Sequence, residues 1–85
     1  MKLDILYFAW VREAIGLDGE PCAPPDTVGT VAELVDWLAT RSDGHARAFA
    51  DRSKIRAALD QVFVPMDTAL GDAREVALFP PVTGG

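Results

Sequence analysis

The sequence predicts an α+β fold in which a mixed sheet of four to five strands packs on one main helix. Two observations lead to this fold class. One amphipathic helix with a clear start signal lies near the middle of the chain, and short apolar segments lie on both sides of it. The chain has 85 residues, of which 49% are hydrophobic and 25% charged. This length and composition are typical of one globular domain with a single core.

The first predicted strand covers residues 2–9. Side chains in a strand alternate between two faces. One face would carry Leu3, Ile5 and Tyr7, and the other Asp4, Leu6 and Phe8. Because both faces are mostly apolar, the pattern is typical of a central strand that is covered on each side.

Two short elements are expected before the main helix. Residues 10–15 predict a short helix, and Gly16 suits the left-handed conformation that often closes a helix. Residues 19–23 predict a second strand, which the prolines of Pro24-Pro25-Asp26 end.

The main helix is expected to begin after Thr30. Thr30 and Glu33 have the spacing of a capping box, in which each side chain bonds the free backbone N–H of the other residue. The buried stripe at i, i+3, i+4 and i+7 consists of Val31, Leu34, Val35 and Leu38. We expect the helix to continue to Thr40 and to stop at Ser42-Asp43-Gly44.

The second half of the chain predicts a shorter helix and three strands. The helix covers residues 45–50, with Ala46, Phe49 and Ala50 turned inward. The strands cover residues 55–59, 62–64 and 75–79, with a turn at residues 70–73 before the last one. In the last strand Val76 and Leu78 would face the core, and Ala77 and Phe79 the opposite side. Pro80-Pro81 then ends the sheet, so we expect a domain of residues 1–80 and a flexible tail of residues 81–85.

The charge balance points to a basic partner. Thirteen acidic residues against eight basic ones give a net charge of −5. Nucleic acid and anionic membranes are therefore poor partners, whereas a basic surface or tunnel is favoured. One cysteine cannot form an internal disulfide, Asp4 interrupts the first apolar run, and no run approaches 18 apolar residues. The expected location is the cytoplasm.

The residue types of enzyme active sites are sparse. His45 is the only histidine, and the acids near it are Asp43 and Asp51. Because metal sites need three or four ligands, we expect no metal site and interpret His45 as an exposed residue at a helix start. Cys22 has no basic neighbour to lower its pKa, which favours a packing residue over a nucleophile.

One face of the predicted sheet is a candidate docking surface. Leu6, Phe8, Phe63 and Phe79 share the strand phase that points away from the main helix. Exposed aromatic residues in such number are typical of a partner surface. A shift of one residue in the register would instead bury them, and the pattern alone leaves both alternatives open.

The last two residues, Gly84 and Gly85, are the most informative feature of the chain. Without a Cβ, a terminal glycine carboxyl group can be approached from every side and can thread a narrow tunnel. Pro80 and Pro81 stiffen the base of such a tail. This favours a chain end that enters another protein's active site, although a frayed terminus without a role remains the alternative.

Both ends of the chain resemble one known family. Residues 7–16, with the sequence YFAWVREAIG, are similar to the Phe-Ala-x-x-Arg-Glu-x-x-Gly opening of the molybdopterin synthase small subunit family. Residues 75–85, EVALFPPVTGG, resemble that family's ending almost residue for residue. The chain departs from the family pattern at Asp60-Gln61 and at Asp72-Ala73-Arg74 in two turns.

The resemblance implies a ubiquitin-like β-grasp fold and a role as sulfur carrier rather than enzyme. The carboxylate of Gly85 would be adenylated by a ubiquitin-activating-like adenylyltransferase that uses ATP, and a sulfur donor enzyme would convert it to a thiocarboxylate. The large subunit would supply the catalytic residues and form the molybdopterin dithiolene from cyclic pyranopterin monophosphate. Two small and two large subunits would assemble, and no cofactor would be bound permanently.

The roles of the tail residues follow from the same resemblance, whereas Leu6, Phe8 and Phe63 are docking candidates because of their strand phase. Pro81, Val82, Thr83 and Gly84 would insert into the large subunit, and Leu6, Phe8, Phe63, Phe79 and Pro80 would dock on it. Three alternatives stay open: the related sulfur carrier of thiamin biosynthesis, a protein modifier that forms isopeptide bonds through Gly85, and a β-grasp adaptor that only binds. The segment Phe79-Pro80-Pro81-Val82-Thr83 argues against the thiamin carrier.

Overall fold

A computed structural model describes residues 1–81 of the chain, and it confirms the α+β fold class. The strands are β1 (Leu3–Tyr7), β2 (Gly19–Cys22), β3 (Arg56–Leu59), β4 (Val62–Val64) and β5 (Glu75–Phe79). The helices are α1 (Ala9–Ile15), α2 (Val31–Leu38) and α3 (Asp43–Ala48), with a short 3-10 helix, η1, at Arg52–Lys54.

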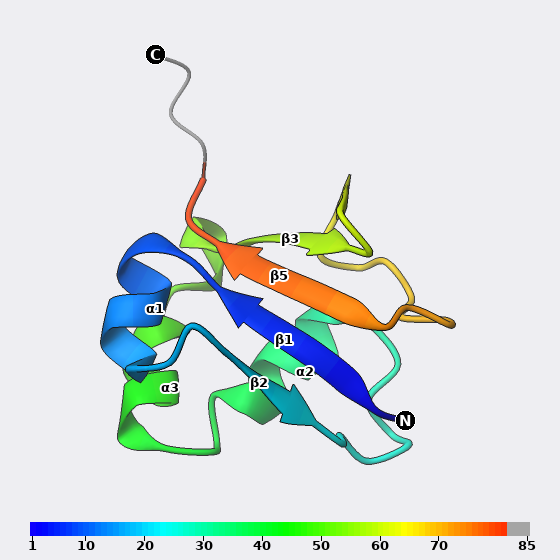
Figure 1. Ribbon diagram of the computed structural model, residues 1–85, viewed down its shortest axis with the longest axis horizontal. Helices are drawn as coiled ribbons and strands as arrows, with labels where there is room; N and C mark the ends of the chain where they lie inside the picture. Colours follow the sequence, from blue (N-terminus) through cyan, green and yellow to red (C-terminus); the bar gives the residue numbers. More distant parts are fainter. Residues whose placement is uncertain (82–85) are drawn as a thin grey trace.

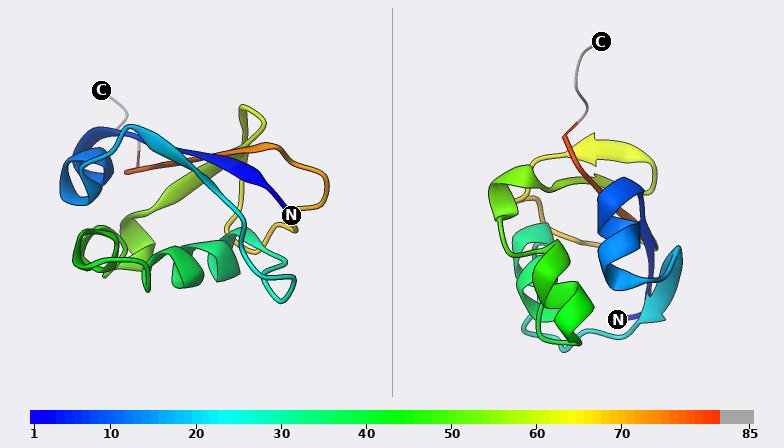
Figure 2. Two further views of the ribbon diagram at one scale, coloured as in Figure 1. Left: turned by 60° about the horizontal axis from the view of Figure 1, so that its bottom comes forward. Right: turned by 90° about the vertical axis from the view of Figure 1, so that its left-hand side faces the viewer.

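The five strands form one mixed sheet in the order β2-β1-β5-β3-β4. Strands β1 and β5 are parallel and central, whereas the other neighbours are antiparallel. Helices α2 and α3 lie on one side of the sheet, as Figures 1 and 2 show. The opposite face carries no helix in these views, which leaves it available as a surface.

The core lies between the sheet and α2. The inward residues of β1, Leu3, Ile5 and Tyr7, are buried, as the alternation predicted. The same holds for the predicted helix stripe, Val31, Leu34, Val35 and Leu38. Val76 and Leu78 of β5 also belong to this core, so the predicted phases of β1, α2 and β5 are confirmed.

Helix α2 starts as predicted and ends earlier than expected. Thr30 Oγ1 accepts a hydrogen bond from Glu33 N at 3.2 Å, and Thr30 N donates to Glu33 Oε1 at 3.1 Å, which is the predicted capping box. The helix ends at Leu38 rather than at Thr40. Ala39 N still donates to Val35 O, but the two amides after it bond carbonyls only three residues back, since Thr40 N donates to Trp37 O and Arg41 N to Leu38 O. These bonds tighten the last turn and stop the helix.

Of the three residues predicted to face inward in the shorter helix, Phe49 is buried as expected, but the predicted phase is wrong at the other two. Ser42 does not terminate the main helix; its side chain accepts from His45 N and caps the start of α3. The helix therefore begins at Asp43, and its inward residues at i, i+3 and i+4 are His45, Ala48 and Phe49. Ala46 and Ala50, which were expected to face inward, are exposed.

The two turns that depart from the family pattern are both ordered. Asp60 and Gln61 form the two-residue hairpin between β3 and β4 with φ values of 47° and 73°. Asp60 Oδ1 accepts from Arg74 N and Glu75 N, both at 3.0 Å, and so ties this hairpin to the start of β5. In the second turn the positive φ falls on Gly71, at 53°, directly before the departing residues.

No helix within residues 1–81 is long and apolar enough to cross a membrane.

Candidate functional site: an aromatic hollow beside the C-terminal tail

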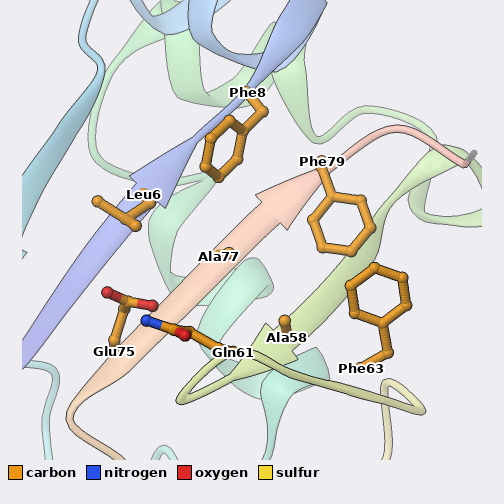
Figure 3. Close-up of a pocket in the computed structure, with 8 residues that line it drawn as sticks. All are labelled: Leu6, Phe8, Ala58, Gln61, Phe63, Glu75, Ala77 and Phe79. Atoms are coloured by element: carbon orange, nitrogen blue, oxygen red, sulfur yellow. The ribbon is translucent and has the colours of Figure 1, made fainter.

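The sheet face away from the helices carries the predicted aromatic residues. Phe8 is 47% exposed and Phe63 is 72% exposed, while Leu6 and Phe79 are half-buried. Figure 3 shows these four side chains around one hollow that spans β1, β5, β3 and β4. The predicted strand phase is therefore confirmed, and a one-residue shift that would bury the phenylalanines is excluded.

Two alanines create the hollow. The strand register places Leu6 beside Ala77, Ala77 beside Ala58, and Ala58 beside Phe63, in one row across the sheet. The two central side chains are single methyl groups, whereas the outer two are large. The row is thus low in its centre and raised at both ends, which gives an open hollow of about 460 Å³.

The aromatic end of the hollow is also the point where the chain leaves the sheet. Phe8 follows β1 and Phe79 ends the parallel strand β5, and Phe8 N donates to Leu78 O at 3.2 Å. The rings of Phe79 and Phe63 pack at a centroid distance of 5.1 Å. Pro80 is half-buried and Pro81 exposed directly after them. The segment that leads to the C-terminus therefore starts at the rim of the hollow.

Four residues of the predicted site, Val82, Thr83, Gly84 and Gly85, lie outside the described residues. Their roles in insertion and sulfur transfer stay predictions.

The interior holds a polar cluster that the sequence interpretation missed. His45 is 6% exposed and not a surface residue, so that expectation is wrong. Its Nε2 lies 2.7 Å from Glu20 Oε2, and its Nδ1 lies 2.7 Å from Ser42 Oγ. Tyr7 Oη donates to the same Glu20 oxygen at 2.7 Å. The acid that bonds His45 is thus on β2, and neither Asp43 nor Asp51 takes that place.

Burial and hydrogen bonds shift the pKa values of two members of this cluster. Burial raises the pKa of the Glu20 carboxyl group, but the hydrogen bonds from His45 and Tyr7 outweigh this effect and hold the pKa below its ordinary value. Burial and the adjacent Glu20 raise the pKa of the Tyr7 phenol well above its ordinary value. Because each group is bonded to another member, the cluster ties β1, β2 and α3 together. A sequence signal existed, since an inward-facing tyrosine usually needs a partner for its hydroxyl.

Cys22 is a packing residue, as predicted. It is 5% exposed, and burial raises the pKa of its thiol, with the charge of Glu20 as a further cause. A thiol in this environment stays protonated and is a poor nucleophile. Within residues 1–81, no group of three or more His, Cys, Asp and Glu side chains is placed to hold a metal ion.

Comparison with known proteins gives one family across nearly the whole chain. The model of the ThiS family matches residues 5–85. The molybdopterin synthase sulfur carrier subunit of Escherichia coli (strain K12) is 43% identical over 83 residues, which cover 98% of this chain and 99% of the relative.

Two solved structures share the fold. Small archaeal modifier protein 1 of H. volcanii superposes with a TM-score of 0.68 at 24% identity, covering 95% of this chain and 98% of its own. A complex of subunits 1 and 2 of molybdopterin-converting factor from Helicobacter pylori 26695 gives a TM-score of 0.62 at 21% identity, covering 100% of both chains. At these identities the likeness shows the fold alone.

Proposed function

Because the chain belongs to the ThiS family and closely resembles a molybdopterin synthase sulfur carrier subunit, we propose that it carries sulfur on Gly85 for such a synthase. The observation that carries the proposal is the position of the hollow. An exposed aromatic surface lies directly at the base of the segment that ends in Gly84-Gly85. A docked partner would therefore receive the chain end next to its contact surface.

The chemistry of the carrier begins at the terminal carboxylate. A carboxylate is a poor electrophile, so an oxygen of Gly85 first attacks the α-phosphate of ATP and pyrophosphate leaves. Sulfur at the oxidation level of sulfide, supplied by a donor enzyme, then attacks the acyl carbon of this acyl-adenylate, AMP departs, and a thiocarboxylate remains. Its nucleophilic sulfur then bonds to a carbon of cyclic pyranopterin monophosphate, and water cleaves the resulting thioester, which leaves the sulfur on the substrate and restores the carboxylate of Gly85. Two such deliveries build the dithiolene of molybdopterin.

The partner that receives the tail is the large subunit of the synthase. The H. pylori structure with the same fold is a complex of subunits 1 and 2, which supports a partner of this kind. The hollow offers Phe8, Phe63 and Phe79 as contacts, and aromatic residues are enriched among interface hot spots. We place the catalytic groups on the large subunit, because His45 and Glu20 bond each other in the interior. Assembly as two small and two large subunits, in the cytoplasm, belongs to the same proposal.

Two variants that move or block the terminal carboxyl group test the proposal. Deletion of Gly85 retracts the reacting carbon by about 3.3–3.6 Å, and a misplacement of even ~1 Å can cost about 100-fold in rate. One residue added after Gly85 instead converts the carboxyl group into a peptide bond. We expect both variants to lose molybdopterin formation with the purified large subunit, while circular dichroism and most of the binding affinity stay unchanged.

The added-residue variant is the stricter of the two. If it still delivered sulfur at the wild-type rate without being trimmed, the reacting group would not be the carboxylate of Gly85, and the carrier function would be wrong.

A further inference from the structure

Two carboxylates lie side by side at the end of the hollow away from the tail. Asp4 and Glu75 are direct partners in the parallel register of β1 and β5, on the same face as Leu6 and Ala77. Asp4 is exposed, and Glu75 is half-buried and lines the hollow in Figure 3. Neither side chain has a hydrogen bond or an ion pair within residues 1–81.

This arrangement is unfavourable in the free chain. Like charges directly opposite each other on neighbouring strands destabilise a sheet, and adjacent apolar surface weakens the screening by water. The cations next to them in sequence, Lys2 and Arg74, form no ion pair with either carboxylate within the described residues. A cation brought by a partner would remove the repulsion and gain two charge-assisted contacts.

From the hollow and these carboxylates we infer the contact that the partner offers, an inference that rests on the proposed function. The large subunit places one bulky apolar side chain over Ala58 and Ala77, and beside it a lysine or arginine against Asp4 and Glu75. The apolar contact supplies most of the affinity, whereas the ion pairs fix the orientation. A second copy of this chain, with a net charge of −5, is a poorer occupant.

The parallel strands also set the spacing of this contact. Asp4 precedes Phe8 by four residues, and Glu75 precedes Phe79 by four. At about 3.3 Å per residue, the carboxylates lie roughly 13 Å from the aromatic end. The partner's cation is therefore expected roughly 13 Å from Phe8 and Phe79, where the tail leaves the sheet. A partner docked in the reverse direction would place its cation on phenylalanines and leave both carboxylates unpaired.

The test uses the full chain and its purified large subunit in titration calorimetry over a series of salt concentrations. Ala77→Leu fills the hollow, and the double variant Asp4→Asn/Glu75→Gln removes the charge pair. The matched control, Asp26→Asn/Asp67→Asn, removes two exposed carboxylates that do not line the hollow. Thermal melts of every variant separate effects on binding from effects on folding.

We expect Ala77→Leu to weaken binding at least about 10-fold with little change in melting temperature. The double variant should raise the melting temperature of the free chain, weaken binding about 10- to 100-fold at low salt, and reduce the salt dependence. The control should match the wild type in affinity. If wild-type affinity and salt dependence persist in both test variants, the inferred contact is wrong while the carrier function stands.

Two other outcomes would overturn the inference in distinguishable ways. If the wild-type chain does not bind the large subunit at all, the proposed function fails and the inferred contact fails with it. If sedimentation shows the free chain as a dimer that Ala77→Leu dissociates, the hollow is occupied by a second copy.

Discussion

At the scale of single residues, the protonation state of the Glu20 carboxyl group is linked to the stability of the fold. Its carboxylate accepts hydrogen bonds from Tyr7 and His45, and these partners lie 13 and 25 residues away along the chain. Local patterns carry no information on such distances, so the sequence could not pair His45 with Glu20. Only the β1–β2 register and the early start of α3 bring the three side chains together.

The lowered pKa of Glu20 predicts how stability depends on pH. Since the folded-state pKa lies below the ordinary value of 4.5, the unfolded chain binds protons first as the pH falls. The contribution of Glu20 is therefore complete above pH 4.5 and is lost as the pH falls through the folded-state value. We expect Glu20→Gln to be less stable by about 1–3 kcal/mol near pH 7, and this difference to shrink below pH 4.5.

Urea denaturation at several pH values measures this effect. Glu13→Gln is the matched control, because Glu13 is an exposed carboxylate on α1 that makes no hydrogen bond within the described part of the chain. A constant difference between Glu20→Gln and wild type down to pH 3 would show that the carboxylate charge does not stabilise the fold.

At the scale of elements, strands were easier to predict than helix ends. The inward residues of β1 and β5 were predicted correctly, although both faces of these strands are mostly apolar and the pattern alone left a shift of one residue open. The structure excludes that shift, because it would exchange the two faces completely. The ends of α2 and α3 depended on Ser42, which suits either a helix stop or a helix start. The choice of the wrong role shifted the inward set of the second helix to Ala46 and Ala50.

The two faces of strand β5 have different roles: one packs in the core, and the other lies at the hollow. Phe79 lies half-buried at the hollow, whereas Val76 is 0% exposed in the core. We expect Phe79→Ala to weaken binding to the large subunit by about 2–4 kcal/mol, more than it weakens folding. Val76→Ala should instead cost about 1.5–3 kcal/mol of stability with little effect on affinity per folded molecule. Thermal melts and titration calorimetry on both variants separate the effect on stability from the effect on binding. A large fall in the melting temperature of Phe79→Ala would show that this residue belongs to the core.

At the scale of the whole molecule, the division of labour follows from where the helices lie. Helices α2 and α3 cover one face of the sheet and pack on the core, so the other face is left for contact, and residues 80–81 leave the sheet at the rim of the hollow (Figure 2). The fold was predictable from the sequence, and the apolar face was one of two alternatives that the sequence pattern left open and the structure decided. The chemistry of the Gly-Gly ending stays a prediction. The shape of the hollow was not predictable, because it depends on the register that aligns Ala77 with Ala58.

The most direct test of the central claim is the intact mass of the full chain after incubation with its activating enzyme, ATP and sulfide. The carrier function predicts a gain equal to the difference between sulfur and oxygen, located by fragmentation at Gly85. Cys22→Ser should show the same gain, and a chain with one residue added after Gly85 should show none. No gain in the wild type, a gain lost in Cys22→Ser, or a chain joined to lysine instead would contradict the claim.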